Sequence, residues 1–136
     1  MMKKGTIAKK YYEEGYNCCQ AVVLAYAEEI GMDADALLRL SSSFGGGMGG
    51  LGEVCGAVSG MFLVLGALKG YDSSAMPGDK QLHYARIRAA ASRFTEKYGS
   101  LLCRDLKSAD GGRATCGELV ENAAEMLLDF LSESEN

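Results

Sequence analysis

The chain has 136 residues and a formal net charge of −4 at pH 7, with 48% apolar and 24% charged residues. This length is enough for one domain with its own hydrophobic core. The acidic balance argues against non-specific binding of nucleic acids, because that binding needs a basic face. The longest uncharged stretch, residues 54–68, is too short to span a bilayer. No secretory leader is recognisable, so we expect a cytoplasmic protein whose thiols stay reduced.

Nearly every periodic segment of the chain predicts a helix. The pattern predicts helices over residues 3–14, 18–30, 33–43, 54–69, 84–98 and 116–131, with a short turn over 100–106. Gly31 and Gly99 follow two of these segments, in the place where a left-handed glycine ends a helix. We therefore predict a single all-α domain over residues 1–136. It is a bundle of five to six helices with a glycine-rich loop and a frayed tail at 132–136.

Four of the five cysteines lie at predicted helix starts. They are Cys18 after Asn17, Cys55 after Glu53, Cys103 after Ser100, and Cys116 after Thr115, which forms a capping box with Glu118. The first turn of a helix presents unpaired N–H groups and a partial positive charge. Such a place favours the thiolate, which is the form that attacks disulfides and binds metals. The placement predicts redox or metal-binding chemistry at these four cysteines.

The four cysteines are widely separated along the chain, and no Cys-x-x-Cys pair is present. A shared site therefore has to be assembled by the fold. Cys19 adjoins Cys18, but neighbouring helix positions point about 100° apart, so we interpret Cys19 as a packing thiol. The alternative for the whole set is simple packing, because free cysteines are often buried as small apolar residues.

Residues 45–52 contain six glycines and cannot form a stable helix. The run follows a predicted helix rather than a strand, so its match to G-x-G-x-x-G does not indicate a dinucleotide site. Successive backbone N–H groups in such a turn form an anion-binding nest, here immediately before Cys55. We predict that the nest stabilises a thiolate or donates hydrogen bonds to cluster sulfur. The predicted cofactor-binding residues are Gly45, Gly46, Gly47, Gly49, Gly50 and Gly56. The alternative is a flexible hairpin between two helices.

Three stretches of the chain resemble the C_GCAxxG_C_C family of small redox-active proteins. They are residues 15–22, the glycine run over 44–50, and residues 52–60, in which Cys55 to Gly60 spell Cys-Gly-Ala-x-x-Gly. The resemblance covers nearly the whole chain. It implies that the family's four cysteines, and hence the redox or metal-ligating residues, are Cys18, Cys55, Cys103 and Cys116. Cys19 is a departure, since small residues are usual at its place.

Three functions remain open. In the first, the four cysteines ligate an iron–sulfur cluster or another thiolate-bound metal, and the protein transfers electrons to a redox partner protein. In the second, pairs of cysteines cycle between dithiol and disulfide, as in a thiol oxidoreductase or sensor. In the third, the chain is a helical interaction module with structural cysteines, and Gly56 and Gly60 serve helix packing or homodimerisation. The pattern does not decide whether the protein is an enzyme.

Overall fold

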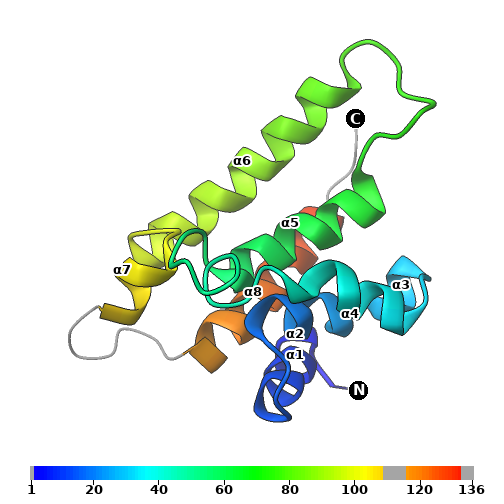
Figure 1. The fold of residues 1–136 in the computed structure, drawn as a ribbon. Helices are drawn as coiled ribbons and strands as arrows, with labels where there is room; N and C mark the ends of the chain where they lie inside the picture. Colours follow the sequence, from blue (N-terminus) through cyan, green and yellow to red (C-terminus); the bar gives the residue numbers. More distant parts are fainter. Residues whose placement is uncertain (1, 109–115, 133–136) are drawn as a thin grey trace.

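The structure is a computed structural model that describes residues 2–108 and 116–132 (Figure 1). Within these ranges the chain forms eight helices and no strand. They are α1 (Lys4–Glu13), α2 (Cys18–Ala25), α3 (Ala27–Ile30), α4 (Ala34–Ser42), α5 (Gly56–Lys69), α6 (Asp79–Tyr98), α7 (Cys103–Ser108) and α8 (Cys116–Ser132). The predicted all-α class is confirmed, but the bundle has more helices than the five to six predicted.

Two departures account for the larger number of helices. The helix predicted over residues 18–30 is broken at Tyr26, which has φ −111° and ψ 15°. The Tyr26 ring is buried, and its hydroxyl donates a 2.7 Å hydrogen bond to the carbonyl oxygen of Ala124 on α8. This long-range contact accompanies the break, which neither glycine nor proline marks in the sequence. The turn predicted over 100–106 is the second departure, because from Cys103 onward it forms the short helix α7.

Several predicted helix ends are confirmed. Gly31 ends α3 with φ 75° and Gly99 ends α6 with φ 86°. Asp33 caps α4, where its carboxylate accepts a 3.0 Å hydrogen bond from the amide of Ala36. The capping box predicted at Thr115 and most of the tail predicted to fray lie outside the described residues.

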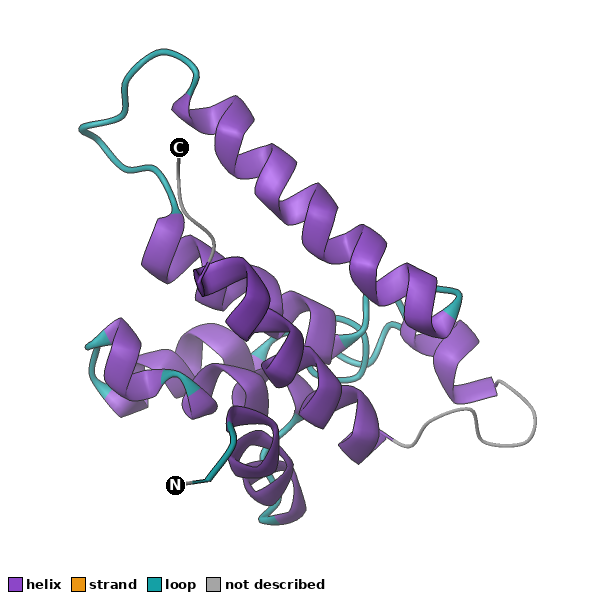
Figure 2. Ribbon diagram, turned by 180° about the vertical axis from the view of Figure 1, so that it is seen from behind, coloured by secondary structure: helices purple, strands orange, loops and turns teal. Residues whose placement is uncertain are grey.

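The apolar helix α5 forms the centre of the bundle. It packs against α2, α8 and α6, and α1 lies across α8 and α2. Helices α5 and α6 run antiparallel and are joined by the loop over residues 70–78, as both views of the ribbon show (Figure 2). The starts of α7 and α8 and the glycine-rich loop lie at the opposite end of this pair. Among the described residues, no helix combines the length and apolar character needed to cross a membrane.

Candidate functional site

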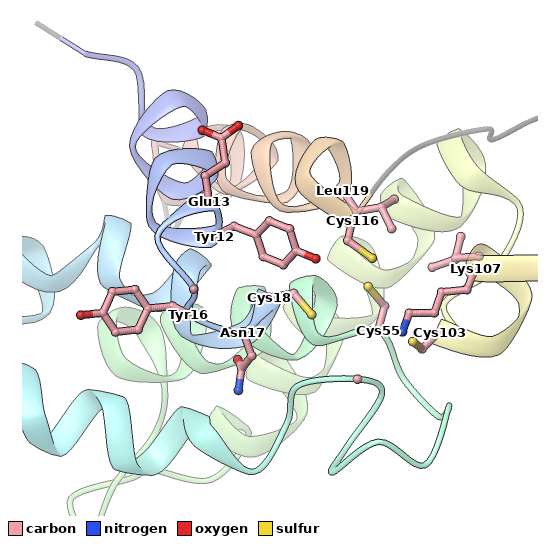
Figure 3. A pocket seen from close by; sticks show the side chains of 13 residues that line it. Tyr12, Glu13, Tyr16, Asn17, Cys18, Cys55, Cys103, Lys107, Cys116 and Leu119 are labelled. Atoms are coloured by element: carbon pink, nitrogen blue, oxygen red, sulfur yellow. The ribbon is translucent and has the colours of Figure 1, made fainter.

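One cavity of about 550 Å³ lies where the helix starts meet (Figure 3). All four cysteines predicted to act together line it, and each comes from a different segment of the chain. The lining residues are Tyr12, Glu13, Gly15, Tyr16, Asn17, Cys18, Gly46, Cys55, Cys103, Leu106, Lys107, Cys116 and Leu119. The fold thus brings four thiols to one place without a disulfide, since all five cysteines are free.

Cys18 is the first residue of α2, and its position is fixed by a capping box. The Asn17 side chain accepts a 2.8 Å hydrogen bond from the Gln20 amide, and the Gln20 side chain accepts one from the Asn17 amide at 3.1 Å. The Asn17 side chain also donates to the carbonyl oxygen of Ser42 at 3.1 Å. A Cβ atom on Gly45 would lie 2.6 Å from the Asn17 side chain, so only glycine leaves room for this cap.

The two glycines of the Cys-Gly-Ala-x-x-Gly motif bring α5 against α2. A Cβ atom on Gly56 would lie 2.7 Å from the Cys18 sulfur, and one on Gly60 would lie 2.8 Å from the Cβ atom of Val22. Side chains at these positions would therefore push the two helices apart. The motif serves to place Cys55, the N-cap of α5, beside Cys18. Gly56 itself does not line the cavity, although the sequence predicts it as a cofactor-binding residue.

A short antiparallel backbone pairing connects the segments that carry Cys55 and Cys103. Val54 and Leu102 form an isolated β-bridge. The Cys55 amide donates to the carbonyl oxygen of Leu101 at 2.7 Å, and the Cys103 amide donates to that of Glu53 at 2.6 Å. Because these bonds flank both cysteines, the spacing between the two segments is set by the backbone rather than by side chains.

Burial dominates the electrostatics of the cavity. It raises the pKa of the Cys55 thiol to about 12, although the amides of Ala57 and Val58 act in the opposite direction. Burial likewise raises the pKa of Cys103, against the opposing charge of Lys107. The sequence predicts thiolates here, because helix starts favour them. The amides at the start of α5 do act that way, but loss of solvation outweighs them. Burial therefore favours the neutral thiol form of Cys55 and Cys103.

Backbone hydrogen bonds within the glycine-rich loop restrict which of its amides could belong to the predicted anion nest, and the nest itself stays a prediction. Five amides of this segment donate to carbonyl oxygens of the same segment, so they are not available to a ligand. They belong to Met48, Gly50, Leu51, Gly52 and Glu53. Of the six predicted cofactor-binding glycines, only Gly46 lines the cavity; Gly45, Gly47, Gly49, Gly50 and Gly56 do not. At Gly47, φ is +74° and a Cβ atom would lie 2.7 Å from that of Cys103, so this glycine serves close packing.

Cys19 takes no part in the cavity. Its side chain is 0% exposed and belongs to the hydrophobic core, and burial raises its pKa to about 12. This is the packing role that the sequence indicates. The single histidine, His83, is also remote from the cavity; its Nδ1 atom lies 3.0 Å from Arg86 on the same helix, α6.

Lys107 and Tyr12 are two of the lining residues that the sequence analysis did not single out. Lys107 is the only Lys or Arg among the lining residues. It follows Cys103 by one helical turn, a spacing that could have identified it. Tyr12 lies on α1, and in the sequence its spacing indicates only that it belongs to the apolar face of this helix. Its side chain nevertheless lines the cavity, and its hydroxyl points toward Cys116 and Cys18 (Figure 3). Only the path of α1 across α8 reveals this position, and no local pattern encodes that path.

The donor set suits a soft metal centre by its chemistry, because thiolates select iron–sulfur clusters, zinc and copper(I). A single tetrahedral ion would need its sulfurs about 2.3 Å from the metal. Among residues 2–108 and 116–132, no group of three or more His, Cys, Asp or Glu residues lies close enough together to hold one ion. The arrangement therefore does not fit a single-ion site as it stands, whereas four thiols around one cavity match the donor number of a cluster.

Comparison with known proteins identifies the family. The family described as "Putative redox-active protein (C_GCAxxG_C_C)" matches residues 16–130. The chain belongs to this family, as its motifs indicate. No curated protein and no solved structure is significantly similar to the chain. Helix α1, which carries Tyr12, lies before the matched residues.

Proposed function

We propose that the protein is an electron-transfer protein whose Cys18, Cys55, Cys103 and Cys116 hold an iron–sulfur cluster. The observation that carries this proposal is the convergence of four thiols, from four separate segments, on one cavity of about 550 Å³. Cys₄ ligation is usual for both [2Fe–2S] and [4Fe–4S] clusters. When bound, the cluster would supply one-electron redox chemistry, and the four cysteines would hold it in the cavity.

The electrostatics of the cavity support a metal centre over free thiolates. The raised pKa values of Cys55 and Cys103 mean that their negative charges are not compensated by the protein alone. Lys107 is the only Lys or Arg of the cavity lining. Iron ions would supply the missing positive charge and displace the thiol protons. Metal affinity should therefore rise with pH over the range in which these thiols are protonated.

Anaerobic purification followed by iron and acid-labile sulfide analysis tests the proposal. We expect bound iron and sulfide with visible charge-transfer absorbance, and loss of both in Cys18→Ser, Cys55→Ser, Cys103→Ser and Cys116→Ser. Cys19→Ala is the matched control, because Cys19 adjoins Cys18 yet is buried in the core. The proposal fails if the protein takes up no iron even after reconstitution with ferrous iron and sulfide.

A thiol oxidoreductase or redox sensor is the second candidate, and Lys107 favours it. The Lys107 ammonium opposes the rise that burial causes in the pKa of Cys103, so Cys103 would be a better nucleophile than Cys55. Two thiols would form a disulfide with release of two protons and two electrons to an external oxidant. Counting free thiols before and after mild oxidation tests this function. A pairwise loss among the four cavity cysteines supports it, and an unchanged count refutes it.

A further inference from the structure

Helix α1 supplies one wall of the cavity. Tyr12 and Glu13, in its last turn, line the cavity, as do Gly15 and Tyr16 in the segment that leads to α2. The Tyr12 ring points from α1 into the cavity (Figure 3). The family match begins at residue 16, after α1 has ended. The four cavity cysteines are thus enclosed in part by a helix that precedes the matched residues.

Apolar packing contributes less to the attachment of α1 than to that of the central helix α5. Within α1, which the structure describes in full, the buried residues are Gly5 and Ala8. In α5 they include Val58, Met61 and Leu65. The larger side chains of α1 that pack against the core are only partly buried: Ile7, Tyr11 and Tyr12. Since fully buried large side chains supply most of the hydrophobic stabilisation, α1 should detach at a lower free energy than α5.

Polar contacts at the first turn of α1 hold this helix in place. The Gly5 amide donates to the Glu125 carboxylate on α8 at 2.7 Å. The Lys4 ammonium donates to the carbonyl oxygen of Ala25 on α2 at 2.9 Å and pairs with Glu29 on α3 at 2.6 Å. We call these contacts of Lys4 and Gly5 the latch. Because the Lys4–Glu29 pair is partly exposed, salt should weaken the latch by screening it.

Gly15 gives α1 a hinge at the end nearest the cavity. Its φ is +109°, and an added Cβ atom would meet none of the described atoms within 4 Å. The backbone there can therefore change conformation without steric hindrance. Beyond the hinge, α2 is held by the capping box of Asn17 and Gln20, so Cys18 keeps its place when α1 moves. Opening can thus remove one wall of the cavity without dismantling the cysteine site.

We propose that α1 is a hinged cover of the cavity, closed by the latch and able to open while the rest of the fold stays intact. As regulation of the cluster site, this inference rests on the proposed function, because iron and sulfide have to enter the cavity before a cluster can form. The opening itself belongs to the metal-free protein. Cys55 and Cys103 are 4% and 7% exposed, so the closed form should protect them from reagents in solution.

Hydrogen exchange of the metal-free protein, followed by mass spectrometry, tests the opening. In wild type, the amides of α1 should exchange faster than those of α5. Lys4→Met removes the ammonium of the latch and should accelerate exchange in α1 about tenfold, which corresponds to about 1.4 kcal/mol, without changing exchange in α5. Lys10→Met is the matched control, because Lys10 is exposed on the same helix, and it should leave both rates unchanged. High salt should accelerate α1 exchange in wild type but not in Lys4→Met.

Iodoacetamide alkylation at neutral pH tests access to the cavity. Lys4→Met should increase the alkylation rates of Cys55 and Cys103 about as much as it accelerates exchange in α1. Cys19 is the internal reference, because it is 0% exposed in the core and does not line the cavity, so its rate should not change. Circular dichroism checks the fold. Glu125→Gln, which takes the charge from the acceptor of the Gly5 amide, is a second latch variant and should act in the same direction.

The outcomes separate this inference from the proposed function. The cover is overturned if α1 and α5 exchange at the same rate in wild type, because α1 would then open only with the whole fold. It is also overturned if Cys19 accelerates as much as Cys55 and Cys103, or if α1 exchange rises while their alkylation does not. If the latch variants open the cavity but reconstitution yields no cluster, the cover stands and the cluster is refuted. If a cluster forms and the latch variants change neither rate, the cluster stands and the cover is refuted.

Discussion

The two ends of the α5–α6 pair are built differently. Every buried residue of α5 lies between Gly56 and Leu65, at the end that meets the cavity. The buried residues of α6, which are Ala90, Phe94 and Tyr98, lie in its second half, at the same end. At the far end, formed by residues 66–89, no residue is buried. The cavity end is therefore held by buried long-range packing, whereas the far end is held by partly exposed contacts, such as the hydrogen bond from Arg86 to the carbonyl oxygen of Lys69.

Substitution on α6 gives the largest expected contrast between these ends. Phe94 is 0% exposed and its ring lies 4.8 Å from that of Tyr98, whereas Leu82 on the same helix is 56% exposed. Phe94→Ala should lower the free energy of unfolding by about 3–5 kcal/mol. Leu82→Ala should change it by less than about 0.5 kcal/mol. Urea denaturation measures both. Similar losses in the two variants would mean that the far end is as tightly packed as the cavity end.

Alkaline pH should destabilise the fold, because two buried thiols near the cavity end of α5 resist ionisation. Cys55 and Cys19 titrate near pH 9 when unfolded but have pKa values of about 12 in the fold, because they are buried. Between pH 9 and pH 12 the unfolded chain therefore binds fewer protons, so stability falls as pH rises. At pH 10 the two thiols together should cost roughly 3 kcal/mol relative to pH 8.

Cys19→Ala isolates one of these two contributions. Because the variant lacks one buried thiol, its stability should fall by about 1.4 kcal/mol less between pH 8 and pH 10 than that of the wild type. Urea denaturation at each pH gives the slope independently of any loss of packing. Equal slopes in the two proteins would show that the Cys19 thiol is not protected from ionisation.

The sequence is most informative where structure is local. Glycines that end helices, such as Gly31 and Gly99, act through their own backbone, and their positions are confirmed. The break at Tyr26 and the place of Tyr12 in the cavity lining depend instead on how α8 lies against α2 and α1. Local patterns contain no information on that packing.

In the candidate site, too, the sequence predicts the local features but not those that depend on the whole fold. The placement of Cys18 at a helix start follows from Asn17, which forms the predicted kind of cap. The protonation state of Cys55 does not follow from its helix start, because burial opposes the helix amides and is stronger. Burial is a property of the whole fold. A motif therefore predicts which residues meet a helix start, but not the environment that the assembled fold gives them.

Replacing either of two glycines of α5 by alanine should change the free energy of unfolding, but in opposite directions. A Cβ atom on Gly60 would lie 2.8 Å from that of Val22 and 3.2 Å from the carbonyl oxygen of Cys19, whereas one on Gly66 meets nothing within 4 Å. Gly60→Ala should destabilise the fold by about 1–3 kcal/mol through overpacking. Gly66→Ala should stabilise it by about 0.5–1 kcal/mol through helix propensity. Thermal and urea denaturation measure both changes. If Gly66→Ala destabilised the fold as much as Gly60→Ala, the space around Gly66 would not be open.

The smallest expected effect concerns the surface above the cavity cysteines. Glu53 and Arg104 form a 3.1 Å ion pair, and both side chains are about half exposed. A double-mutant cycle with Glu53→Gln and Arg104→Gln should give a coupling energy of about 0.2–1 kcal/mol, which falls further in high salt because exposed charges are screened. A coupling energy above about 2 kcal/mol would mean that this ion pair, rather than the backbone, aligns the segments that carry Cys55 and Cys103. The backbone hydrogen bonds from Cys55 to Leu101 and from Cys103 to Glu53 survive both substitutions, so the cysteine positions should not move.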